Sequence, residues 1–114
     1  MADRIRVNGV ELSVEDAGVG SPIVLVHGWS MSGRFFQRQL HGLSAGHRVI
    51  VPDLRGHGRS EKALHGHTVP GCAMDLQALL IQLGVQRPVL VGWSMGAMVA
   101  SEFIGGRRLT SSFS

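Results

Sequence analysis

The residue whose neighbours best suit it to chemistry is Ser94, at the centre of the segment Gly92-Trp93-Ser94-Met95-Gly96. A G-x-S-x-G pattern is weak evidence in a chain with 16 glycines, so its context must decide. An apolar run at 89–91 leads into the motif and a helical pattern leads out, which is the strand–turn–helix context that a nucleophilic serine needs. Such a tight turn requires tiny residues two positions away on each side, as Gly92 and Gly96 are. The alternative is an ordinary serine that caps a helix.

A second segment, His27-Gly28-Trp29, follows the apolar run at 23–26. It would lie at the carboxyl end of a strand, where α/β proteins place ligands. Acyl transfer needs two backbone N–H groups that face the oxygen on which negative charge develops. Met95, directly after the serine, would supply one, and Trp29 would supply the other. For His27 we favour a structural role, in which it ties backbone segments together, over a catalytic one.

A third segment, Asp53-Leu54-Arg55-Gly56-His57-Gly58-Arg59-Ser60, follows the apolar run at 49–51. Two glycines among charged residues predict a tight, hydrogen-bonded loop. We interpret this loop as scaffold near the mouth of the site and not as an acid–base pair.

Two kinds of strand must position these segments. Residues 4–16 alternate between apolar and polar side chains around Asn8-Gly9, which predicts an antiparallel hairpin. The runs at 23–26, 49–51 and 89–91 are continuously apolar, as in parallel strands that are covered on both faces. The sequence therefore predicts an α/β fold with an N-terminal hairpin, three parallel strands and flanking helices.

Three helices are predicted around these strands. The first covers 32–43, and the second runs from Thr68, a capping residue followed by Pro70, to a stop at Gly84. The third runs from Met95 to about Ile104, and we expect 105–114 to be a disordered or non-family tail. The expected packing residues are Phe36, Leu40 and Leu43 in the first helix, Cys72, Leu76, Leu79, Leu80 and Leu83 in the second, and Met95, Met98, Val99 and Phe103 in the third.

Composition excludes several classes of function. The chain has 114 residues, 44% hydrophobic and 17% charged, which suits one globular unit. Its net charge of +3 is spread along the chain, so we expect no nucleic-acid partner. The single cysteine, Cys72, forms no internal disulfide and suggests no metal framework, and we expect no cofactor. No apolar run approaches the ~20 residues of a membrane span, so we expect a cytoplasmic protein without a membrane partner.

The three segments together, in this order and spacing, resemble the α/β-hydrolase superfamily, and the resemblance covers about Ile5 to Ile104. It implies that Ser94 is a nucleophile and that the amides of Trp29 and Met95 form an oxyanion hole. Gly28, Gly92 and Gly96 would be the glycines of these motifs. The motifs are most similar to those of the esterase and cofactor-free haloperoxidase (perhydrolase) branch. A serine at position 94 argues against dehalogenases and epoxide hydrolases, which have an aspartate there.

The pattern breaks after the third helix. By the resemblance, later strands should carry a catalytic acid and a histidine, so we expect 1–104 to be a partial, truncated domain. His57 could replace the missing base only from a distance. The strands that precede His57 and Ser94 would have a third strand between them, which puts their ends roughly 10 Å apart, too far for a hydrogen bond. His41, His47, His65 and His67 are expected at the surface or in loops. The strand at 89–91 would become a bare apolar edge, which favours self-association.

Three functions remain open. The chain could be a serine hydrolase that acts on small carboxylic esters, with its base outside this sequence. It could be an inactive remnant that acts by binding or self-association. Finally, the same scaffold could catalyse perhydrolysis or C–C bond cleavage.

Overall fold

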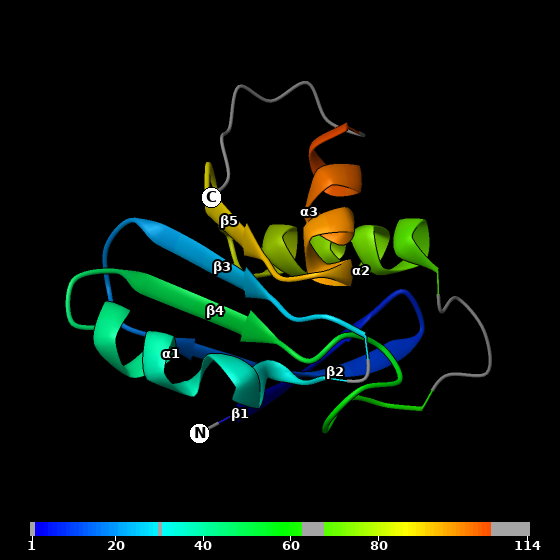
Figure 1. The fold of residues 1–114 in the computed structure, drawn as a ribbon, viewed down its shortest axis with the longest axis horizontal. Coiled ribbons are helices and arrows are strands. Elements are labelled where there is room, and N and C mark those ends of the chain that lie inside the picture. The colour runs from blue at the N-terminus through cyan, green and yellow to red at the C-terminus, as the bar shows by residue number, and fades with distance from the viewer. Residues whose placement is uncertain (1, 30, 63–67, 106–114) are drawn as a thin grey trace.

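The computed structural model describes residues 2–29, 31–62 and 68–105. These residues form a mixed five-stranded sheet with helices on both faces (Figure 1). In chain order the elements are β1 (Ala2–Val7), β2 (Val10–Ala17), β3 (Pro22–Val26), the 3₁₀ helix η1 (Gly33–Phe36), α1 (Gln37–Leu43), β4 (Arg48–Pro52), α2 (Val69–Gln82), β5 (Val89–Gly92) and α3 (Met95–Gly105).

The N-terminal hairpin is confirmed. Strands β1 and β2 are antiparallel, with Val7 opposite Val10. The two turn residues, Asn8 and Gly9, have φ of 48° and 81°. Two successive positive φ values characterise the two-residue turn that Asn-Gly favours, because its twist matches that of the strands.

The strand order, β1-β2-β4-β3-β5, explains how distant segments meet. Strand β3 lies between β4 and β5 and is parallel to both, as predicted. The carboxyl ends of the three parallel strands therefore lie at the same end of the sheet, and the segments that follow them emerge there together. Within the described part of the chain, β5 is an outer strand of the sheet, hydrogen-bonded to β3.

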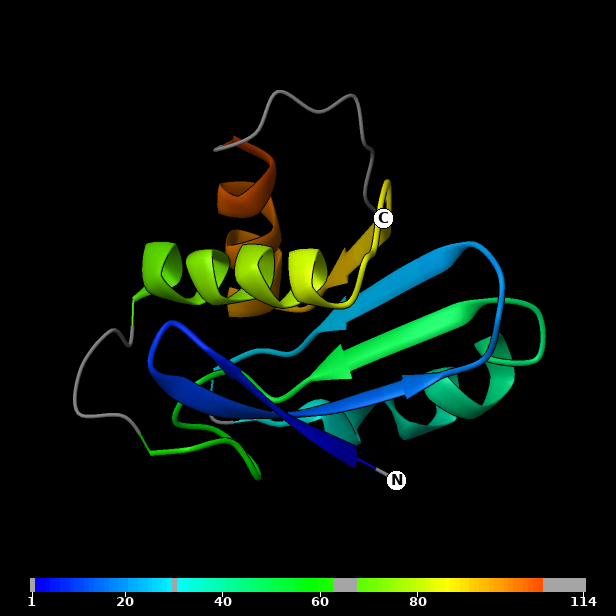
Figure 2. The same ribbon diagram turned by 180° about the vertical axis from the view of Figure 1, so that it is seen from behind.

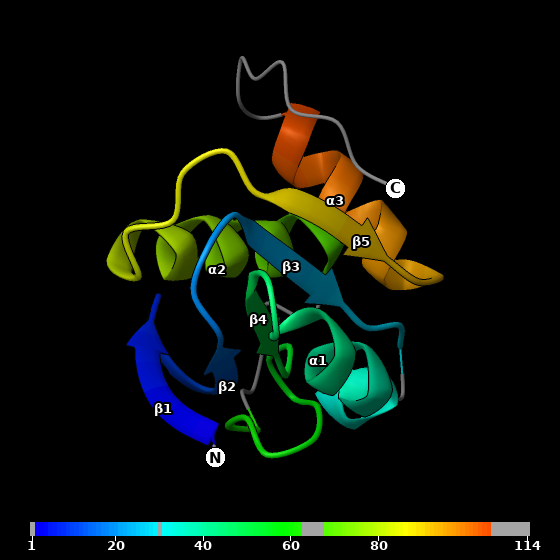
Figure 3. The same ribbon diagram turned by 90° about the vertical axis from the view of Figure 1, so that its left-hand side faces the viewer.

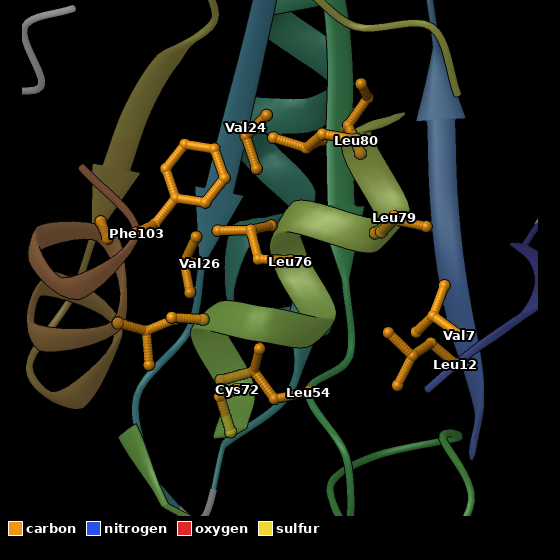
Figure 4. Packing of buried hydrophobic residues seen from close by; sticks show 14 of the residues in the cluster. Val7, Leu12, Val24, Val26, Leu54, Cys72, Leu76, Leu79, Leu80 and Phe103 are labelled. Atoms are coloured by element: carbon orange, nitrogen blue, oxygen red, sulfur yellow. The ribbon is translucent and has the colours of Figure 1, made fainter. Parts of the chain in front are cut away.

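The helices form two layers of unequal size. Helices α2 and α3 cover one face of the sheet, and η1 and α1 cover the other (Figures 2 and 3). The larger core lies under α2 and α3, where Leu76 and Phe103 pack with strand residues such as Val24 and Val26, and Leu79 belongs to the same cluster (Figure 4). A smaller cluster on the other face joins Phe36 and Leu40 to inner residues of β3 and β4.

The second helix begins and ends at the predicted signals. The Thr68 hydroxyl accepts a hydrogen bond from the Gly71 amide (3.0 Å), and Pro70 lies in the first turn. Gly84 follows the helix with φ of 70°, a left-handed conformation that costs glycine nothing. The predicted stripe is buried from Cys72 to Leu80, and Leu83 packs partly buried against the same core.

Two predictions about the other helices need correction. The segment 32–43 is not one helix but a 3₁₀ turn, capped by Ser32, followed by α1. In α3, Met98 is 59% exposed and does not pack against the sheet, whereas Val99 and Phe103 are buried as expected. The buried face of α3 runs through Gly96, Val99, Ala100 and Phe103. Met98 is off this stripe, since buried positions on a helix recur every three or four residues.

Several predictions lie outside the described residues. These are the surface placement of His65 and His67 and the tail beyond Gly105, which is itself the last residue of α3. His41 is exposed and His47 half-buried in the loop before β4.

Candidate active site

Ser94 occupies a two-residue turn between β5 and α3. The strand ends at Gly92, the helix begins at Met95, and Ser94 has φ of 57°. A left-handed backbone is uncommon for a residue with a Cβ and costs roughly 1–2 kcal/mol. The turn is closed by hydrogen bonds from the Gly96 amide to the Trp93 carbonyl (2.9 Å) and from the Trp93 amide to the Val26 carbonyl (3.1 Å). Ser94 itself is exposed, so the strained turn presents it at the surface.

Gly92 and Gly96 make this turn possible, because neither position has room for a side chain. A Cβ on Gly96 would overlap the carbonyl oxygens of Val26 and His27. A Cβ on Gly92 would lie 2.5 Å from backbone atoms of Ala97 and Gly96. The start of α3 is thus pressed directly against β5 and the end of β3, as the motif glycines predicted.

The loop after β3 lies against the same turn. A Cβ on Gly28 would be 3.2 Å from the Cβ of Ser94 and 3.0 Å from the Trp93 carbonyl oxygen. The fold therefore brings Gly28 and Ser94 together although they are far apart in sequence. Trp29 follows Gly28 in this loop, and Met95 is the first residue of α3, where amides have no acceptor within the helix. The residues predicted to supply the two N–H groups are thus the immediate chain neighbours of Gly28 and Ser94.

His27 is fully buried and bonded to backbone on both ring nitrogens. The Leu54 amide donates to Nε2 (2.9 Å), and Nδ1 lies 2.7 Å from the Gly28 carbonyl oxygen. Burial lowers the pKa of His27 below its usual value, because the charged ring would lose its hydration. The prediction that His27 ties backbone segments together is confirmed.

The loop after β4 is the predicted scaffold. The Asp53 carboxylate accepts hydrogen bonds from the amides of Gly33 (2.6 Å) and Arg59 (2.9 Å). The Ser60 hydroxyl donates to the Asp53 carbonyl and accepts from the Ser13 amide (2.8 Å), which joins the loop to β2. The Asp53 side chain is therefore occupied by backbone amides, as expected of a residue that organises a loop.

His57 and Arg55 in this loop are also engaged. His57 Nδ1 lies 3.0 Å from the Arg55 carbonyl oxygen, so Nδ1 carries the proton and donates it. The Arg55 side chain is buried and forms two hydrogen bonds with the Asp75 carboxylate of α2, at 2.6 and 2.8 Å. No sequence pattern indicated this ion pair, because its partners are 20 residues apart on a loop and a helix with no shared periodicity.

Exposed aromatic side chains surround the turn. Trp93 stacks on Phe35 with ring centroids 5.9 Å apart, and Trp29 meets His57 edge to face at 4.8 Å. Trp29, Phe35 and Trp93 are each about half exposed. Phe35 was not among the residues predicted from the sequence to lie at the site. The sequence did contain an indication of its exposure. Phe35 directly precedes Phe36, which shares the buried face with Leu40, so the ring of Phe35 has to point away from that face.

Within residues 2–29, 31–62 and 68–105, no group of three or more His, Cys, Asp or Glu side chains could hold a metal ion. In the same part of the chain, no helix has the length and apolar character to cross a membrane.

Comparison with known proteins identifies this arrangement. Residues 21–105 match the model of the alpha/beta hydrolase fold family. A non-heme chloroperoxidase homologue from Synechocystis is 40% identical over 97 residues, which cover 84% of this chain and 35% of that protein. Among solved structures, bromoperoxidase from Bacillus anthracis has a TM-score of 0.91 and 36% identity, covering 99% of this chain and 44% of that one. Esterase EaEST from Exiguobacterium antarcticum has a TM-score of 0.90 and 33% identity, covering 100% of this chain and 43% of that one.

Other relatives widen the range of reactions. They include a soluble epoxide hydrolase from Corynebacterium and the N-acyl homoserine lactonase AidH. The chain spans about a third of the length of the curated relatives it matches, and it corresponds to their N-terminal part. The family match, the strand order and the relatives all agree, and the chain belongs to the alpha/beta hydrolase fold family.

Proposed function

We propose that this chain carries the nucleophile and oxyanion hole of a serine hydrolase that acts on small carboxylic esters. The observation that carries the proposal is the exposed Ser94, held with φ of 57° on a strand–helix turn whose flanking glycines admit no side chain. Strained backbone that the surrounding structure enforces is concentrated at functional sites. Relatives named as an esterase and as a lactonase support ester chemistry.

In the proposed reaction, Ser94 Oγ attacks the acyl carbon and gives its proton to a base. The carbonyl oxygen becomes negative and is bound by the amides of Trp29 and Met95, with the positive end of the α3 dipole nearby. Expulsion of the alcohol, which takes up the proton, leaves an acyl-enzyme. Water then releases the acid and restores the serine.

In this proposal, the described residues do not supply the base that Ser94 needs. Among the described residues, His27 bonds backbone through both ring nitrogens and has no lone pair left for a base, whereas His57 donates from Nδ1 to the Arg55 carbonyl. Strand β3 also separates β4, which precedes His57, from β5, which precedes Ser94. A serine hydroxyl without a base is a poor nucleophile, so the chain alone should react slowly.

The names of the haloperoxidase relatives favour a second candidate, perhydrolysis. In that reaction hydrogen peroxide replaces water as the attacking molecule, and the acyl-enzyme is released as a peracid. The nucleophile and oxyanion hole are the same. Peracid formation from an ester and hydrogen peroxide, measured beside hydrolysis, separates the two candidates.

Labelling with a fluorophosphonate tests the nucleophile. We expect the unchanged chain to be labelled and Ser94→Ala to lose the label. Ser101→Ala, at an exposed serine within α3, is the matched control and should be labelled like the unchanged chain. Equal labelling of Ser94→Ala, or none in the unchanged chain, would contradict the proposal and favour an inactive remnant. Slow ester turnover alone does not demonstrate a triad. An oxyanion hole and substrate binding can by themselves raise the rate of hydrolysis ~10³-fold above the rate in water.

We also propose that the chain self-associates through β5. This strand is apolar, lies at the edge of the sheet among the described residues, and leaves Val89 37% exposed. An unpaired, apolar strand edge is a template for pairing with another chain. Light scattering at tens of micromolar should show dimers or larger species, and a clean monomer would contradict this proposal.

A further inference from the structure

The peptide that joins Gly28 to Trp29 is held by its oxygen. The Gly28 carbonyl oxygen lies 2.7 Å from His27 Nδ1 and accepts a second hydrogen bond from the Met31 amide (3.2 Å). A peptide unit is planar and trans, so its N–H points opposite to its C=O. Whatever fixes the Gly28 oxygen therefore also fixes the direction of the Trp29 N–H.

The bonds of His27 define which nitrogen carries its proton. The Leu54 N–H can only donate, so Nε2, at 2.9 Å from it, must present a lone pair. Nδ1 faces a carbonyl oxygen, which can only accept, so Nδ1 carries the hydrogen. The ring is neutral, and the Leu54 amide selects this tautomer.

We propose that His27 is a positioning residue for the oxyanion hole, acting through the Gly28 carbonyl on the N–H of Trp29. The inference rests on the proposed function of Ser94, since it assigns His27 a purpose in that reaction. The Gly28 backbone is next to Ser94, where a Cβ on it would lie 3.2 Å from the serine Cβ. The hydrogen bond from Nδ1 also polarises the peptide, which makes the Trp29 N–H a stronger donor.

The loop after β4 secures Trp29 a second time, through its side chain. The indole of Trp29 meets the ring of His57 edge to face at 4.8 Å. His57 is fixed in turn by donation from Nδ1 to the Arg55 carbonyl. Leu54, which orients His27, and Arg55, which orients His57, are adjacent in this loop. The loop after β4 thus orients both the peptide N–H and the side chain of Trp29.

The chain offers a matched pair of variants that separates the two bonds of His27. Asparagine carries its side-chain NH₂ where histidine has Nδ1, so His27→Asn keeps the donor to Gly28 and loses the acceptor for Leu54. Glutamine reaches the position of Nε2, so His27→Gln keeps the acceptor for Leu54 and loses the donor to Gly28. Each variant loses one buried hydrogen bond, so we expect both to lower the urea midpoint of unfolding to a similar extent.

The first measurement is the rate at which a fluorophosphonate labels Ser94. Loss of an oxyanion-hole donor typically costs about 10²–10³-fold in rate, and a donor that is misdirected but present should cost less. We expect His27→Gln to slow labelling by about 10- to 100-fold and His27→Asn to stay within about threefold of the unchanged chain. Equal losses in both variants, or a larger loss in His27→Asn, would overturn the proposal.

The second measurement does not depend on reactivity. In ¹⁵N-labelled protein, His27 should show a protonated Nδ1 and an unprotonated Nε2. Both variants lose the imidazole ring, so the amide resonance of Trp29 should move in both, but further in His27→Gln, which also loses the donor to Gly28. The opposite tautomer, or a Trp29 amide that moves no further in His27→Gln than in His27→Asn, would overturn the proposal. If these signatures appear while Ser94 of the unchanged chain is not labelled, the positioning role is supported and the proposed function fails.

Discussion

The loop after β4 and the turn after β5 each hold a serine near the site, Ser60 and Ser94, but the two regions use polar side chains in opposite ways. In the loop, the side chains of Asp53, Arg55, His57 and Ser60 are buried and each is hydrogen-bonded to protein. At the turn, Ser94 is exposed on a backbone with φ of 57°. The first region stabilises the fold with charged groups, and the second region holds one hydroxyl in a strained conformation at the surface.

The difference shows why residue type alone does not locate a reactive group. A buried polar group must be paired, because leaving it without a partner costs about 1–3 kcal/mol or more. Pairing commits its protons and lone pairs to the fold. A nucleophile must instead keep its oxygen accessible, and the cost of holding it there is met by glycines that let the backbone pack closely.

The largest effect is expected from breaking the buried ion pair. Arg55→Leu leaves the Asp75 carboxylate, only 2% exposed, without its cation. Removing one partner of a buried pair typically costs about 3–5 kcal/mol of unfolding free energy. Urea unfolding, followed by circular dichroism, measures this loss.

The control is Arg48→Leu, which breaks a more exposed pair with Asp16 on β2. There the side chains remain 28% and 19% exposed, so water can replace part of the interaction. We expect a cost of about 1 kcal/mol. Equal costs at the two sites would show that burial of the loop after β4 does not set its energetic importance.

A methyl group added at the turn should be costly without any change of polarity. In Gly96→Ala the new Cβ meets the backbone carbonyl oxygens of Val26 and His27, so β3 and α3 must separate. We expect a loss of about 1–3 kcal/mol, typical of overpacking. Gly42→Ala in α1, where a Cβ meets nothing within 4 Å, should instead gain about 0.5–1 kcal/mol from helix propensity. A tolerated Gly96→Ala would mean that the contact between β3 and α3 is looser than the structure shows.

Much of the fold could be predicted because its signals are local. The hairpin at Asn8-Gly9 and the caps of α2 at Thr68 and Gly84 depend on a few adjacent residues whose conformational preferences are strong. The three segments around the site could be found because each follows an apolar strand. Parallel strands then bring their carboxyl ends together whatever the loops do.

The remaining features depend on tertiary contacts that no local pattern encodes. Met98 has the same apolar character as its neighbours, and only the packing of Gly96 against β3 determines which face of α3 is buried. The pairing of Arg55 with Asp75, and the contact of Phe35 with Trp93, join residues from different elements. For His27, its structural role could be anticipated, but the choice of tautomer required the position of the Leu54 amide.

The buried histidine gives the scaffold a dependence on pH. Burial lowers the pKa of His27 in the folded chain, so the unfolded chain, with the usual value near 6.5, binds more protons as pH falls. The contribution of the neutral His27 to the free energy of unfolding is therefore fully present above pH 6.5 and decreases as the pH is lowered below that value. The slope for one group cannot exceed about 1.4 kcal/mol per pH unit. Comparing urea midpoints at pH 7.5 and 5.5 with those of His27→Asn isolates the effect, and an identical pH dependence in both proteins would contradict it.

The smallest effect tests the strain at Ser94 itself. Ser94→Gly and Ser94→Ala both remove the hydroxyl, but only glycine adopts φ of 57° without a Cβ penalty. Glycine relieves the ~1–2 kcal/mol of backbone strain that a Cβ causes at this φ, but part of this gain is offset by the greater freedom of glycine in the unfolded chain. We therefore expect Ser94→Gly to be more stable than Ser94→Ala by about 0.5–1 kcal/mol, measured by urea unfolding.

The same difference between Arg87→Gly and Arg87→Ala, at φ of 53° in the loop before β5, calibrates the backbone contribution away from the site. If Ser94→Gly is no more stable than Ser94→Ala while the Arg87 pair differs, the turn after β5 is not strained, and the contrast with the loop after β4 rests on exposure alone.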